Sequence, residues 1–108
     1  MYYDHEHDLK RIGEMKALAP EDFTAWMNLD KIVGRQNGKV PAKYRELIAI
    51  AVAHTTQCPY CIEAHTKAAK KAGASKEEVT EAIFVAAAIR SSGAAAHGSM
   101  AMRFYDEA

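Results

Sequence analysis

The sequence of 108 residues predicts an all-α protein, a bundle of about five or six helices joined by short links. Apolar residues recur at three- and four-residue steps along most of the chain, which is the period of an amphipathic helix. No run alternates apolar and polar residues between hairpin turns, as a half-buried strand would. Because the chain is short, we expect one domain over residues 1–108, with a single small core.

Three helices are predicted in the first half of the chain. Apolar residues at helical spacing predict the first over residues 2–18. Pro20 opens the second, because proline suits the first helical position and two acidic residues in that turn favour the positive end of the helix dipole. This helix is expected to end in the glycine-bounded segment 34–38. Pro41 opens the third helix, which carries one apolar stripe and reaches Gln57.

The fourth helix is expected to begin at Cys58 and Pro59 and to end at Gly73, a residue type that often follows a helix. Ser75 and Glu78 then form a capping-box sequence, in which each side chain can accept a hydrogen bond from the other residue's backbone N–H. This pattern predicts that another helix starts directly after Gly73.

The last helix is the longest and is expected to run from Ser75 towards Asp106, with a kink or interruption at residues 91–93, Ser-Ser-Gly. It is rich in alanine, so another helix of the same or a second subunit can approach it closely. Residues 82–102 include Arg90 and several other polar side chains, which argues against a membrane-spanning segment.

Charge and composition argue against several classes of partner. The chain has 14 basic and 14 acidic residues and no cationic run, so neither a nucleic acid nor a membrane is expected to bind. The first ten residues are acidic and polar, unlike a signal peptide, and a cytoplasmic location is expected. In that reducing compartment two cysteines indicate redox or metal chemistry rather than a permanent disulfide.

The two cysteines stand three residues apart at the start of the fourth helix. If Pro59 occupies the first helical position, Cys58 is the N-cap, where unpaired N–H groups and the helix dipole favour a thiolate. Cys61 lies one turn later on the same face, close enough to form a disulfide with Cys58. His65 follows after one more turn, so its imidazole can act as a base towards Cys61. Glu46, in the preceding helix, is the candidate carboxylate for orienting that imidazole.

Together these residues form a specific pattern: Glu46, eleven residues, Cys58-Pro-Tyr-Cys61, three residues, and His65. The pattern resembles the alkylhydroperoxidase AhpD and carboxymuconolactone decarboxylase-like family, in its short branch that carries the CxxC pair. The resemblance covers about residues 40–102. It implies an AhpD-like helical bundle that assembles as a homo-oligomer, a trimer or a hexamer.

The resemblance also implies roles for the four residues. Cys61 is the peroxide-attacking thiolate, Cys58 is the resolving cysteine and proton donor, and His65 and Glu46 form the proton relay. The substrate would be a small hydroperoxide or a disulfide, an external dithiol would be the reductant, and no cofactor or metal is required. The helix dipole favours Cys58 as the more acidic thiol, but we assign the attack to Cys61 because the base lies one turn from it. AhpD has a histidine between its cysteines where this chain has Tyr60.

Two alternatives belong to other classes of protein. A zinc site could use both cysteines and His65, completed by Glu46 or His54, although structural zinc usually gathers ligands from separate segments. A non-catalytic helical oligomer could merely bury its cysteines. His54 and His97 lie on faces of small and apolar residues and are interpreted as core or interface histidines.

Overall fold

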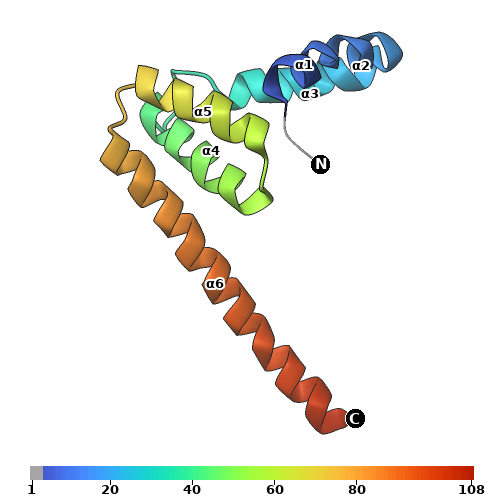
Figure 1. The fold of residues 1–108 in the computed structure, drawn as a ribbon, viewed down its shortest axis with the longest axis vertical. Coiled ribbons are helices and arrows are strands. Elements are labelled where there is room, and N and C mark those ends of the chain that lie inside the picture. Colours follow the sequence, from blue (N-terminus) through green and yellow to red (C-terminus); the bar gives the residue numbers. More distant parts are fainter. Residues whose placement is uncertain (1–3) are drawn as a thin grey trace.

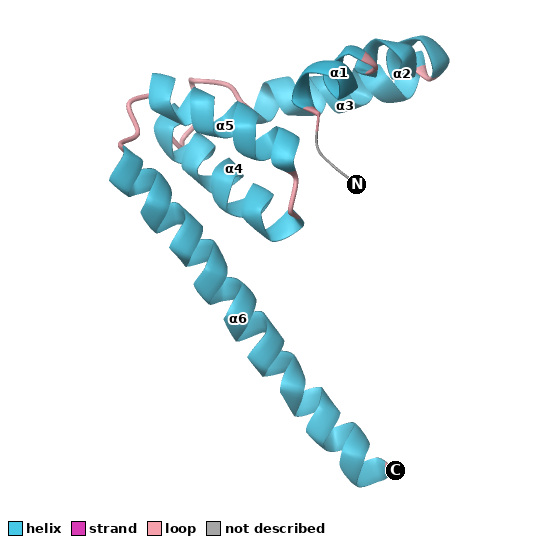
Figure 2. Ribbon diagram, in the orientation of Figure 1, coloured by secondary structure: helices cyan, strands magenta, loops and turns pink. Residues whose placement is uncertain are grey.

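The computed structural model describes residues 4–108, and within them the chain forms six helices and no strand (Figures 1 and 2). In chain order they are α1 (His5–Lys10), α2 (Ile12–Leu18), α3 (Pro20–Val33), α4 (Ala42–Thr56), α5 (Pro59–Lys71) and α6 (Lys76–Glu107). The all-α prediction is therefore confirmed.

The α4–α5 hairpin is the centre of the structure. The two helices lie side by side, α6 packs against α4 through its first half, and α1, α2 and α3 form a separate group beyond the hairpin (Figure 1). Ile50, Ala69 and Ala74 form the buried cluster, and Ile50 is the largest fully buried side chain. A Lys43–Glu78 ion pair of 2.9 Å also joins α4 to the first turn of α6. The core is thus small and consists mainly of contacts among α4, α5 and α6.

The expected first helix over residues 2–18 is wrong in one respect, because α1 and α2 are separate helices that meet at Arg11. Its backbone N–H donates to the carbonyl oxygens of Asp8 and Leu9 rather than four residues back. Gly13 follows. Because glycine is a weak helix former, this segment has little preference for one continuous helix. Tyr2, at the start of the predicted helix, lies outside the described residues.

Helix α4 differs from the prediction by one residue at each end. Pro41 is its N-cap and not its first helical residue. At the other end Gln57 leaves the helix with φ 58° and ψ 46°, the left-handed conformation that often ends a helix. This turn directs the chain into Cys58 and α5.

The capping box at the start of α6 is present as predicted. The Ser75 N–H donates to the Glu78 carboxylate at 2.8 Å, and the Glu78 N–H donates to the Ser75 hydroxyl at 3.0 Å. The expected interruption at residues 91–93 is absent, because α6 is a continuous helix to Glu107. The Ser91 hydroxyl donates back to the carbonyl of Ala88 at 3.0 Å, and strong helix-forming alanines flank the segment.

The second half of α6 extends into solvent beyond the rest of the chain (Figure 1). The radius of gyration is 18.0 Å, compared with about 13 Å for a compact domain of this length. The large apolar side chains exposed along α6 include Phe84, Val85, Ile89, Met100, Met102, Phe104 and Tyr105. Within the described residues, α6 is also the one helix whose length and composition would suit a membrane span, a test that core helices of soluble proteins also pass.

Candidate functional site

The dithiol stands at the N-terminus of α5. Cys58 is the N-cap, and its Sγ accepts a hydrogen bond from the backbone N–H of Cys61 at 3.3 Å. Pro59 occupies the first helical position, which needs no N–H donor. Both cysteines are free and partly buried. The local geometry expected from the Cys-Pro-Tyr-Cys sequence is therefore present.

The two sulfurs interact as a pair. The pKa of Cys61 is raised to about 11, first because its side chain is hydrogen-bonded to Cys58, and then because of burial and the negative charges of Cys58 and Asp30. Cys61 therefore holds its proton tightly while Cys58 is a thiolate.

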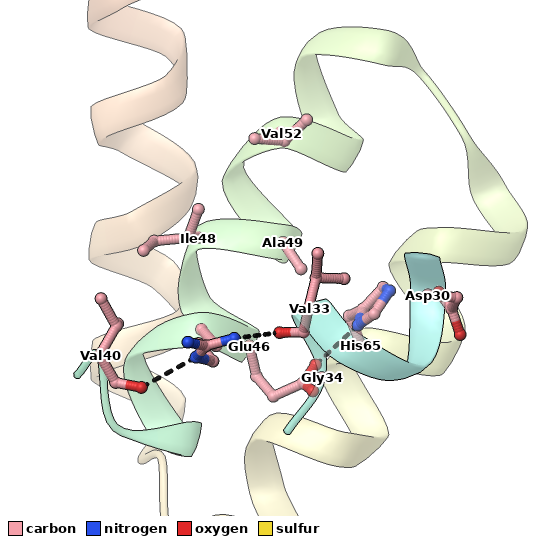
Figure 3. Close-up of a pocket in the computed structure, with 10 residues that line it drawn as sticks. Asp30, Val33, Gly34, Val40, Glu46, Ile48, Ala49, Val52 and His65 are labelled. Atoms are coloured by element: carbon pink, nitrogen blue, oxygen red, sulfur yellow. Dashed lines mark hydrogen bonds and ion pairs between the residues drawn. The ribbon is translucent and has the colours of Figure 1, made fainter. Parts of the chain in front are cut away.

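Glu46 and His65 form a second pair, one turn further along α5. His65 Nδ1 lies 2.6 Å from Glu46 Oε2, so the contact expected between α4 and α5 is present (Figure 3). Their side chains are 19% and 34% exposed, respectively, so the pair is neither fully dry nor fully solvated. When Nδ1–H donates to the carboxylate, Nε2 of a neutral imidazole is left with a lone pair that can accept a proton.

This pair borders an open cavity of about 440 Å³ between α3, α4 and α5 (Figure 3). Apart from the pair, the wall is largely aliphatic and includes Val33, Val40, Ile48, Ala49 and Val52. The cysteines are not among the residues that line it. Across the described part of the chain, no hydrogen bond joins either sulfur to His65, so the dithiol and the Glu46–His65 pair are not directly connected.

Two residues of this region escaped prediction from the sequence. Asp30, from α3, lines the cavity, and its charge contributes to the raised pKa of Cys61. Arg45 also lines the cavity and bonds two backbone carbonyls there. The only sequence signal for Arg45 is its position beside Glu46. Asp30 gave none, because its place depends on how α3 packs against the hairpin.

Tyr60, between the cysteines, connects α5 to α1. Its hydroxyl donates to Asp8 Oδ2 at 2.5 Å, and this bond is the main cause that raises its pKa to about 12. A phenol held in this way gives up its proton less readily than an ordinary tyrosine. In this structure the Tyr60–Asp8 hydrogen bond thus attaches α1 to the start of α5.

We expect Tyr60→Phe to remove the step near pH 12 from the tyrosinate absorbance titration. The native state binds the Tyr60 proton more tightly than the unfolded chain does, so the stability from the Asp8 bond is present below pH 10. It is lost as the pH rises from 10 towards about 12. An absorbance titration that matches the wild type in its last step would contradict the Asp8 contact.

The remaining histidines lie outside this arrangement. His54 Nδ1 is 2.7 Å from the carbonyl oxygen of Ile50, one turn earlier in α4, and His97 is exposed on α6. In residues 4–108 no three histidine, cysteine or acidic side chains are gathered closely enough to hold a metal ion. The zinc alternative thus has no preformed ligand set in that part of the chain.

Comparison with known proteins identifies relatives over most of the chain. The sequence model of the "Carboxymuconolactone decarboxylase family" matches residues 20–103. "Uncharacterized protein 4 in cox locus" of Paracoccus denitrificans is 42% identical over 96 residues, which cover 89% of this chain and 86% of that protein. An uncharacterized protein of Cupriavidus necator is 27% identical over 97 residues, 90% of this chain and 85% of the relative.

Two solved structures have a similar fold. An apo carboxymuconolactone decarboxylase family protein from Legionella pneumophila has a TM-score of 0.71 and 28% identity, over 79% of this chain and 75% of that one. A protein from Methanobacterium thermoautotrophicum has a TM-score of 0.72 and 29% identity, over 80% of this chain and 96% of that one. Sequence and structure thus indicate the same group of proteins.

Proposed function

The chain belongs to the carboxymuconolactone decarboxylase family, and we propose that it is a thiol-dependent oxidoreductase with alkylhydroperoxidase activity. The observation that carries the proposal is the Glu46–His65 contact of 2.6 Å, one helical turn from a Cys58–Cys61 dithiol. An imidazole fixed by a carboxylate is the usual means of moving a thiol proton near neutral pH. The aliphatic cavity beside it would accommodate the organic part of a hydroperoxide or disulfide.

The first step begins with one proton already transferred from the dithiol to His65. The remaining proton moves from Cys61 to Cys58, so that the Cys61 thiolate attacks the terminal oxygen of the hydroperoxide. The O–O bond breaks, and Cys61 becomes a sulfenic acid. The alkoxide takes the proton from Cys58 and leaves as the alcohol. This exchange explains how Cys61 can attack although its pKa is raised while Cys58 is ionised.

The second step closes the disulfide. The Cys58 thiolate attacks the sulfenic sulfur of Cys61 and expels hydroxide, which takes the stored proton from His65 and leaves as water. An external dithiol then reduces the disulfide by thiol–disulfide exchange and is itself oxidised. Each turnover thus converts one hydroperoxide and one dithiol into an alcohol, water and a disulfide.

The proposed activity is tested by intact mass measurement of the metal-free, reduced protein before and after one equivalent of an organic hydroperoxide. We expect a loss of two hydrogens, with one alcohol released per chain. A mass that stays unchanged under these conditions would refute the peroxidase activity.

We further propose that the protein is a homo-oligomer, a trimer or a hexamer, formed through α6. Val85, Ile89 and Met100 lie on one exposed stripe of that helix, at four- and eleven-residue spacing, and isolated chains would leave this stripe in water. Burial of such a stripe against a second copy would stabilise the assembly at about 25 cal/mol per Å² of apolar area.

We expect light scattering to give three or six times the 11.9 kDa of one chain, and Ile89→Asp to lower that mass to one chain, because a charge would enter the interface. Ser91→Asp is the matched control, since Ser91 is exposed and stands two residues from Ile89, on the opposite side of α6. A monomeric wild type, or one that sediments with lipid vesicles, would contradict this assembly.

A further inference from the structure

The Arg45 side chain joins the end of α3 to the start of α4. Its Nε donates to the carbonyl oxygen of Val40 at 2.9 Å, and its Nη1 donates to that of Val33 at 2.5 Å. Val33 is the last residue of α3, and Val40 lies two residues before α4. One guanidinium therefore holds the two ends of the link, residues 34–41, close to each other. Only arginine presents two donors in a rigid fork, so lysine could not make both bonds.

Gly38 makes room for this guanidinium. A Cβ atom at that position would stand 2.0 Å from Arg45 Nη2 and 2.8 Å from its Cζ, so the Arg45 side chain would have to leave its place. The other glycines have no neighbour closer than 3.4 Å to the corresponding point. A methyl group at residue 38 would therefore displace the guanidinium, because the flexible end of Arg45 is the group that can move.

The residues held by this guanidinium form one wall of the cavity beside the relay. Val33, Gly34 and Val40 line it, together with Arg45 itself, and Glu46 and His65 lie on the same cavity (Figure 3). We infer that Arg45 is a positioning residue: seated on Gly38, it fixes the α3–α4 link as the wall that receives the organic part of the substrate. This role rests on the proposed function. The clamp itself, the pair of hydrogen bonds from Arg45 to Val33 and Val40, is a property of the fold.

The test compares Gly38→Ala with Gly13→Ala, a control in which the added methyl meets no atom within 4 Å. For cumene hydroperoxide we expect Gly38→Ala to raise KM roughly tenfold and to leave kcat within about twofold, because pocket contacts are lost and the dithiol is intact. For hydrogen peroxide, which has no organic part, both constants should stay within about twofold. Gly13→Ala should match the wild type with both substrates.

Hydrogen exchange provides a readout that does not depend on activity. Amides of residues 34–41 should exchange faster in Gly38→Ala and in Arg45→Lys, with unchanged exchange in α5. In an Arg45→Ala background, Gly38→Ala should not raise the exchange rate of residues 34–41 any further, because the guanidinium that the methyl group would displace is already absent.

If the amides of residues 34–41 exchange as slowly in Gly38→Ala as in the wild type, the clamp is contradicted. Faster exchange with an unchanged KM for cumene hydroperoxide would overturn the positioning role. If neither hydroperoxide oxidises the wild-type protein, the proposed function fails. The exchange data alone then decide whether the clamp exists.

Discussion

Cys61→Ser should abolish oxidation of the reduced protein by an organic hydroperoxide, whereas Cys58→Ser should gain one oxygen and stop there. The proposed order of attack makes Cys61 the sulfur that accepts oxygen, and without Cys58 no neighbouring thiol can resolve the sulfenic acid. Intact mass measured within seconds of mixing, with a sulfenic acid trap present, distinguishes the two variants. The opposite pattern would assign the attack to Cys58 at the helix N-terminus.

The same pair of variants tests the origin of the raised Cys61 pKa. Cys58→Ser replaces a thiolate by a neutral hydroxyl, which removes the negative charge of the partner and weakens the hydrogen bond from the Cys61 thiol, so the pKa of Cys61 should fall below about 11. The rate of alkylation of Cys61 by iodoacetamide, followed against pH, should therefore rise at lower pH in Cys58→Ser than in the wild type. An unchanged profile would mean that burial alone raises the pKa.

Features that depend on adjacent residues could be predicted from the sequence. The N-cap at Cys58, the capping box of Ser75 and Glu78 and the end of α5 near Gly73 all use hydrogen bonds within one helical turn. The Glu46–His65 contact spans two helices: a helix hairpin made Glu46 a candidate, but only the spacing of the family pattern favoured it over an ordinary solvated glutamate. Local chemistry was therefore sufficient for the caps and not for this contact.

Other features depend on how distant segments pack, and no local sequence pattern predicts them. Asp30 and Asp8 lie near the dithiol because of where α3 and α1 are placed relative to the hairpin. The contact of Gly38 with the Arg45 side chain joins residues seven positions apart, so the sequence does not distinguish Gly38 from an ordinary loop glycine. The unbroken course of α6 was also not predicted, because helix propensity at residues 91–93 is weak while its neighbours are strong.

The small core explains why these long-range contacts matter for the site. Ile50 is the one large side chain that is fully buried among the described residues, so few apolar contacts hold α3 and its link against the hairpin. Polar attachments supply part of the cohesion that a larger core would provide. Arg45 holds the link, Tyr60 holds α1, and Arg90 of α6 donates to the carbonyl oxygen of Thr55. The Glu46–His65 pair thus lies on the α4–α5 hairpin, while its surroundings are held by a few side chains.

Replacing His65 with asparagine should slow single-turnover oxidation about 100-fold, since a positioned general acid–base group typically contributes two to four orders of magnitude. Glu46→Gln should slow it less, by about tenfold, because the imidazole stays but loses the carboxylate that orients it. Both rates are measured as disulfide formation in the reduced protein, without an external dithiol, so that reduction does not enter.

The control is His7→Asn, which changes an exposed histidine on α1 that lies outside the cavity. Circular dichroism must show an intact helical fold for each variant, with a loss of stability of no more than about 1–2 kcal/mol from the broken Glu46–His65 bond. If a folded His65→Asn oxidises as fast as the wild type, the imidazole is not the base. The Glu46–His65 pair would then serve only to join α4 to α5, and the dithiol would have to react through its own proton exchange.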